Sequence, residues 1–280
     1  MKAGGYITWK KLFVILTVFF IAAQIILVFV PVIFAFLWSL VDPEHPWSYP
    51  DAFPKSLSLA TWRYVFRYTN LFKALATSYS LAPLSSLLAF FLALPTAYVL
   101  GRKNFRGKTI ISNLILLPIV LPGMVVALFL SRVFAVFGLT QSFPGLILGH
   151  CLMGIPYMIR ILATSFSSIP QDVIDAAENL GAGMRSKICH VFIPMVLPGL
   201  FAGTIFTFIT SLEEFNLTYI IGTPTFETIP TILYSFLGYH FIRTNAAVVA
   251  IVLMIPNIVM LIIAERLMKT DYLSASLGKM

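Results

Sequence analysis

Charged side chains are the scarcest feature of this sequence. Only 11% of its 280 residues are Asp, Glu, Lys or Arg, whereas 59% are hydrophobic. A soluble globular domain carries about 25% charged residues, so this chain has too few to cover a water-facing surface. The composition therefore excludes an ordinary soluble protein and favours an integral membrane protein.

Cysteine is almost missing, with Cys151 and Cys189 as the only two. The first lies in an apolar segment and the second in a predicted cytoplasmic loop, so we expect no disulfide between them. The apolar segments also lack metal-ligand spacing and paired Ser/His residues. These absences disfavour an intramembrane enzyme, and we expect no catalytic residue, metal or cofactor in this chain.

Long apolar runs are abundant instead. Six of them reach the ~20 residues that cross a bilayer: 12–40, 71–100, 110–137, 144–166, 195–222 and 245–267. We therefore predict an all-α membrane protein with six transmembrane helices. Its expected segments are a cytoplasmic N-terminus (1–11), a first transmembrane helix (12–41), an extracytoplasmic loop (42–70), a transmembrane core (71–270) and a cytoplasmic tail (271–280).

The basic residues are distributed by side of the membrane. Of the 19 Lys and Arg residues, 13 fall in predicted cytoplasmic segments and 6 in outside segments when the N-terminus is inside. This asymmetry sets membrane orientation, and it explains the net charge of +8 without a nucleic-acid partner. We expect both termini to be cytoplasmic.

One cytoplasmic stretch, Gly101 to Thr109, resembles a phosphate-binding P-loop. Five residues separate its two glycines, however, where that motif has four, and it lies between two membrane spans instead of following a strand. We interpret it as a basic membrane anchor and expect no ATP hydrolysis by this chain.

A short polar insert at 167–190 separates the fourth and fifth apolar runs. It predicts two short helices. In the first, Ser168 is a candidate N-cap, Pro170 and Asp172 suit the first turn, and Gly181 supplies a left-handed stop. The second runs from Gly183 to His190. In the first helix, Ala176 and Ala177 leave a shallow surface on which another protein can approach closely.

The insert resembles the EAA loop of inner-membrane permease subunits of binding-protein-dependent ABC importers. That pattern is Glu-Ala-Ala, three residues, Gly, nine residues, then Ile-x-Leu-Pro. It appears here as Asp175-Ala176-Ala177, Gly181 and Val191-x-Ile193-Pro194, with both spacings intact. The departures are Asp for Glu, Val for Ile and Ile for Leu, and the resemblance covers roughly residues 70–270.

The resemblance implies a role and partners. Asp175, Ala176, Ala177, Glu178 and Gly181 would couple the membrane helices to a separate ATPase dimer, which would use ATP and Mg. A second, non-identical permease subunit and an extracytoplasmic solute-binding protein would complete the importer, in a bacterial-type inner membrane. Without a partner, Asp175 and Glu178 would only form a solvated helix face.

Two adjacent carboxylates, Glu213 and Glu214, fall inside the fifth apolar run. An ionisable group in a membrane span costs at least ~2.5 kcal/mol, so this pair should face a cavity or a neighbouring subunit. On a continuous helix Glu213 would group with Asn216, while Ser211, Glu214 and Thr218 would share a second polar stripe. The region resembles that of spermidine/putrescine permeases, which implies a cationic amine.

Nearby aromatic residues could add cation–π contacts to such an amine: Phe215, Tyr219, Tyr234, Tyr239 and Phe241. The tentative substrate path is Glu213, Glu214, Asn216 and Tyr219. Alternatives remain open: the pair could be structural, and the solute could be an aminophosphonate, ferric iron, thiamine or sulfate. An ion-coupled secondary carrier is disfavoured, because its ionisable residues would be distributed over several helices.

Overall fold

The computed structural model describes the backbone of residues 4–48 and 50–277 and the side chains of residues 9, 11–48 and 50–266. Residues 1–3 and 278–280, at the ends of the predicted cytoplasmic segments, lie outside the described part. The regular structure of the described part is helical, and it contains no strand. The chain forms two compact units, Met1–Thr69 with Phe236–Ile251, and Asn70–Ser235 with Val252–Met280.

Five described helical segments are long and apolar enough to cross a membrane: Lys11–Ser39, Leu71–Arg102, Phe143–Ser167, Met184–Glu213 and Arg243–Arg266. They correspond to five of the six predicted spans. The remaining predicted span, the third along the chain at 110–137, is not a continuous helix.

The first unit begins with helix α1 (Gly4–Ser39). None of its most apolar window is buried, as expected for a helix that meets lipid on all sides. The predicted outer loop contains the short helix α2 (Ala60–Tyr68). Trp38, at the end of α1, packs against Trp47 with ring centroids 4.9 Å apart and the rings tilted by 30°.

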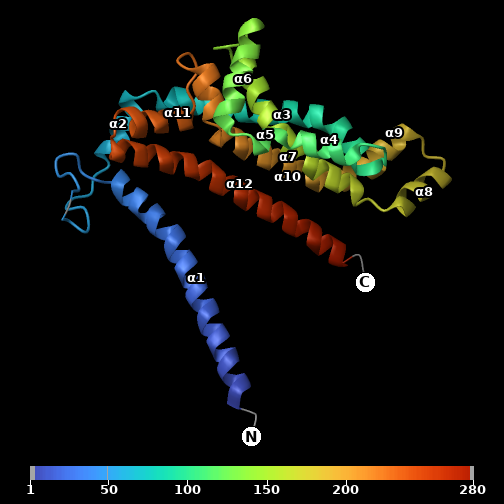
Figure 1. Cartoon of the computed structure of the whole chain (residues 1–280), viewed down its shortest axis with the longest axis horizontal. Coiled ribbons are helices and arrows are strands. Elements are labelled where there is room, and N and C mark those ends of the chain that lie inside the picture. Colours follow the sequence, from blue (N-terminus) through green and yellow to red (C-terminus); the bar gives the residue numbers. More distant parts are fainter. Residues whose placement is uncertain (1–3, 49, 278–280) are drawn as a thin grey trace. The chain divides into compact units, whose positions relative to one another are not determined.

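The second unit is built on three helices that pack side by side: α3 (Leu71–Arg102), α7 (Phe143–Ser167) and α10 (Ile193–Glu213) (Figure 1). Glycines let α7 and α10 approach closely, as is common between membrane helices. A Cβ on Gly154 would lie only 2.2 Å from Cγ2 of Thr207, and one on Gly203 only 2.7 Å from Sδ of Met158.

The third predicted span is broken into α4 (Lys108–Ile115), α5 (Leu117–Val120) and α6 (Gly123–Val136). Leu121 is extended, with ψ 143°, immediately before Pro122. A residue before proline is driven out of the helical region, and proline lacks the backbone N–H that a helix needs. The predicted third transmembrane helix is therefore interrupted at Leu121 and Pro122.

The fifth predicted span also ends early. Helix α10 stops at Glu213, and after two non-helical residues the chain enters a turn that ends in the π-helical segment η2 (Thr218–Gly222). Helix α11 (Ile229–Tyr234) and the π-helical turn η3 (Ser235–Tyr239) follow, before α12 (Arg243–Leu277). The expectation of a helical stripe through Ser211, Glu214 and Thr218 is wrong, because the helix does not continue past Glu213.

Substituting Gly154 by Ala should destabilise the α7–α10 contact. The new Cβ would clash with Cγ2 of Thr207 at 2.2 Å, and overpacking of this kind costs about 1–3 kcal/mol. We expect a lower Tm of the purified protein. Adding Thr207→Ser should restore it, because Ser lacks Cγ2 but keeps the hydroxyl that donates to the Gly203 carbonyl at 2.8 Å.

Gly183→Ala is the matched control, because a Cβ there meets nothing within 4 Å. An unchanged Tm for Gly154→Ala would contradict close glycine packing between these helices.

Candidate functional site: an exposed hairpin and a broken span

The insert after α7 contains helix α8 (Gln171–Asn179), and Gly181 ends it as expected. Gly181 is left-handed, with φ +81°. Its N–H donates to the Glu178 carbonyl at 2.9 Å, and the Ala182 N–H donates to the Ala177 carbonyl at 2.9 Å. These two bonds form a Schellman motif.

The start of α8 differs from the prediction at Ser168. Pro170 occupies the N-cap position without a side-chain cap, while Ser168 Oγ donates backwards to the Ser165 carbonyl at 2.9 Å. Ser168 thus belongs to the end of α7, whose free carbonyls attract its hydroxyl. Asp172 lies in the first turn, as expected.

The predicted separate helix over 183–190 is wrong. Helix α9 (Met184–Lys187) and the π-helical turn η1 (Ile188–Phe192) continue directly into α10, so this segment begins the long span Met184–Glu213. Pro194 lies in the first turn of α10. Insertion of a π turn ahead of it keeps the backbone helical although proline cannot donate.

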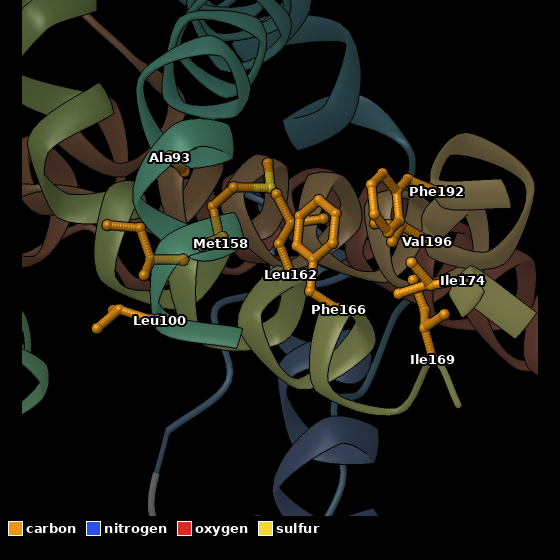
Figure 2. Close-up of a cluster of buried hydrophobic side chains, with 11 residues drawn as sticks. Ala93, Leu100, Met158, Leu162, Phe166, Ile169, Ile174, Phe192 and Val196 are labelled. Atoms are coloured by element: carbon orange, nitrogen blue, oxygen red, sulfur yellow. The ribbon is translucent and has the colours of Figure 1, made fainter. Parts of the chain in front are cut away.

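One edge of α8 is anchored in the protein. Ile174 is 7% exposed and belongs to a cluster of buried apolar side chains with Phe166 of α7 and Phe192 of η1 (Figure 2). Tyr98 of α3 completes a ring triangle with these two, at centroid distances of 5.5 and 5.7 Å. A movement of α8 would therefore displace packed side chains of α3, α7 and α10 as well.

The opposite face of α8 is open. Of the five predicted coupling residues, Asp175, Ala176, Glu178 and Gly181 are exposed and Ala177 is half-buried. Leu180, beside them, is 89% exposed. This arrangement, an anchored edge and a free face with small and apolar side chains, suits contact with another protein.

Polar contacts fix the hairpin to the end of α3. Arg102 Nη1 donates to the Ile169 carbonyl at 2.8 Å, and its Nη2 donates to Gln171 Oε1. Gln171 Nε2 in turn donates to Asp175 Oδ1 at 2.8 Å. In the sequence Arg102 is only one residue of a basic membrane anchor, and its role as a clamp depends on this tertiary contact.

The second feature is the break after α10. Glu214 is extended, with ψ 111°, and its Oε1 accepts the Leu217 N–H at 3.0 Å, in the manner of an N-cap. Glu213 Oε1 accepts from Asn257 Nδ2 of α12 at 2.7 Å. Glu213 is exposed and Glu214 is half-buried.

Three rings gather at the break. The centroid of Phe215 lies 4.7 Å from that of Tyr234 and 5.1 Å from that of Tyr219, and the two tyrosines are 5.4 Å apart. The structure thus brings together three of the five aromatic residues predicted near the carboxylates. Tyr239 and Phe241 belong to the other unit of the chain.

The two helix breaks meet at Asn216. Its Nδ2 approaches Gly123, the first residue of α6, so closely that a Cβ there would be 2.7 Å away. Non-helical backbone at membrane depth is tolerated where it is buried in protein or lines a cavity. Discontinuous helices of this kind commonly form the substrate sites of membrane transporters.

A buried histidine, His150 of α7, also reaches the break. Its Nδ1 lies 2.9 Å from Ser211 Oγ, and its Nε2 lies 3.0 Å from Thr218 Oγ1. Its role is not evident from the sequence. The available signal was a single histidine inside the apolar run 144–166. Among the described residues, no group of three His, Cys, Asp or Glu side chains could hold a metal.

Comparison with known proteins assigns the family. Residues 93–269 match the family described as binding-protein-dependent transport system inner membrane component. The chain belongs to this family. It is therefore a permease subunit of a binding-protein-dependent ABC importer, as the EAA-loop resemblance implied, and an inner-membrane protein.

The family's curated relatives differ in solute. The chain is 31% identical over 213 residues to the molybdenum transport system permease protein ModB of Haemophilus influenzae, covering 70% of this chain and 93% of that one. It is 24% identical over 209 residues to the spermidine/putrescine transport system permease protein PotC of Escherichia coli, covering 75% and 78%.

Chains of two solved ABC transporters share the fold. A chain of a bacterial ABC transporter for the acidic polysaccharide alginate matches with a TM-score of 0.74 at 17% identity, over 91% of this chain and 96% of that one. A chain of the MetNI methionine ABC transporter matches with a TM-score of 0.59 at 18% identity, over 71% and 95%. At these identities the likeness concerns the fold alone.

Replacing Arg102 by Met should loosen the hairpin without unfolding the protein. Hydrogen bonds from a charged donor contribute about 1.5–3 kcal/mol, and the lower end suits a half-buried guanidinium. We expect backbone amides of α8 to exchange with deuterium about tenfold faster, which corresponds to about 1.4 kcal/mol.

Lys103→Met is the control for lost charge, because Lys103 is the exposed next residue and its side chain makes no hydrogen bond or ion pair among the described residues. Equal exchange rates in both variants would contradict a clamp by Arg102.

Proposed function

We propose that this chain forms half of the translocation path of an ATP-driven importer, with a second, non-identical permease subunit supplying the other half. An ATPase dimer would drive it, and an extracytoplasmic protein would deliver the solute. The family assignment supports these partners, as does a solved alginate transporter that is described in complex with a solute-bound periplasmic protein. The chain would cross six times, with α4, α5 and α6 forming an interrupted crossing and both termini cytoplasmic.

Coupling to the ATPase is assigned to the exposed face of α8, with Asp175, Ala176, Ala177, Glu178 and Gly181. The observation that carries this role is the contrast between the two sides of the helix. Ile174 is buried among side chains of α7 and η1, whereas Leu180 is 89% exposed. A partner that pushes on the free face would move the whole apolar cluster, because packed interiors are hard to compress.

Gly181→Trp should uncouple ATP hydrolysis from uptake or prevent the ATPase from assembling. The indole would obstruct the free face, and its backbone would be strained at φ +81°. We expect the subunit to remain in the membrane while uptake falls at least tenfold, measured in vesicles that contain the whole importer.

Gly138→Trp is the matched control. Gly138 is also left-handed, at φ +65°, with nothing within 4 Å of a Cβ, but it follows α6 at the predicted outer side. Unchanged uptake with Gly181→Trp would contradict docking on α8.

The solute best suited to the break is a cationic amine. Glu213 and Glu214 place two carboxylates beside a cluster of three aromatic rings, and rings attract cations through their faces. Each carboxylate has one oxygen in a protein hydrogen bond, to Asn257 and Leu217, and these bonds fix its orientation. The second oxygen of each has no hydrogen bond among the described residues, so it is available to a ligand.

A molybdenum compound is the second candidate, because the chain is 31% identical to a molybdenum permease. Molybdate is an anion and would be repelled by two ionised carboxylates at the break. In that case Glu213 and Glu214 would serve structure only, and selection would depend on the binding protein.

Ligand-stimulated ATP hydrolysis decides between the two. The importer, reconstituted with its binding protein, would be tested with spermidine, putrescine, molybdate and sulfate. Stimulation by an amine is expected. Stimulation by molybdate alone would end the amine proposal while leaving the importer assignment intact.

The double variant Glu213→Gln, Glu214→Gln should weaken amine uptake and preserve assembly, because the amides keep similar shapes and hydrogen-bonding capacity but lose the charge. We expect at least a tenfold higher KM for the amine. Glu44→Gln, at an exposed carboxylate of the outer loop, is the charge control. A wild-type KM in the double variant would assign the carboxylates to structure.

A further inference from the structure

The buried imidazole of His150 bridges the break in the fifth span. Ser211, on its Nδ1 side at 2.9 Å, belongs to α10 before the break. Thr218, on its Nε2 side at 3.0 Å, belongs to η2 after the break. A single side chain of α7 therefore holds both broken ends.

The bridge is fully satisfied and extends to a fourth element. A neutral imidazole has one donor and one acceptor nitrogen, and hydroxyl groups can match either. Ser85 of α3 lies 3.1 Å from Ser211 through its Oγ, which joins α3 to the same network. All four side chains are buried, so loss of one would leave a polar partner unpaired in an apolar interior.

Helix α7 connects this bridge with the α8 hairpin. It is a single helix from Phe143 to Ser167, with His150 toward one end and Phe166 at the other. Sixteen residues separate the two, about 24 Å along a helix. Phe166 packs in the apolar cluster with Ile174 of α8. The hairpin therefore contacts α7 near one end of the helix, and the break contacts it near the other.

We propose that His150 is a positioning residue that transmits displacement of α7 to the helix break carrying Glu213 and Glu214. This rests on the proposed function, because the displacement is the one that α8 would receive from the ATPase. Since the imidazole is bonded on both sides of the break, Ser211 and Thr218 follow α7 together, and the carboxylates between them are reoriented with it.

The test measures coupling per assembled importer. In His150→Phe the ring keeps most of the volume but loses both bonds. We expect unchanged basal ATP hydrolysis, a stimulation ratio by solute-loaded binding protein close to one, and at least tenfold lower uptake. Ser211→Ala and Thr218→Val each remove one bond of the imidazole with little change of shape, and should lower the ratio about threefold; Ser211→Ala also removes the bond to Ser85.

Non-additivity separates this role from general destabilisation. Adding Thr218→Val to His150→Phe should lower the stimulation ratio no further. Thr210→Val is the control, because the Thr210 hydroxyl donates only to the Phe206 carbonyl of its own helix, at 2.8 Å. It should behave as wild type.

A wild-type ratio in His150→Phe would overturn the inference. If that variant fails to assemble, Thr218→Val decides alone, and a wild-type ratio there overturns it equally. Absence of any stimulation in the wild-type importer would instead overturn the proposed function.

Discussion

Backbone polar groups inside a membrane must find partners within the protein, and the second unit of this chain is arranged around that constraint. Its apolar segments do not all run as continuous helices. Where α10 ends, the Glu214 carboxylate takes the Leu217 N–H, and where α6 begins, Asn216 lies against Gly123. A nearby side chain caps the break after α10, and Asn216 packs closely against the start of α6, so both breaks have a defined geometry.

Close packing supplies the rigidity that such breaks lack. Glycines at the α7–α10 contact bring the two helices together, and the cluster around Phe166 joins them to α3 and α8 (Figure 2). Interiors of this density transmit displacement instead of absorbing it. The coupling proposed for α8 needs this combination of a stiff bundle and locally interrupted spans.

The apolar runs predicted where helices lie but not where they stop. Hydropathy reports depth in the bilayer, and a broken segment is as apolar as a whole one. Pro118 and Pro122 lie at the break in the third span, whereas no proline marks the break after Glu213. Gly181 could be predicted because a left-handed stop is local chemistry. The pairing of His150 with Ser211 depends on how α7 packs on α10, which one sequence does not encode in any local pattern.

The two cysteines differ in a way that has an experimental consequence. Cys151 is 1% exposed inside α7, while Cys189 is exposed in η1, next to the hairpin. A maleimide dye added to the native polypeptide would therefore label a single thiol without any engineering. Its fluorescence would report, in real time, when a soluble protein covers that side of the subunit.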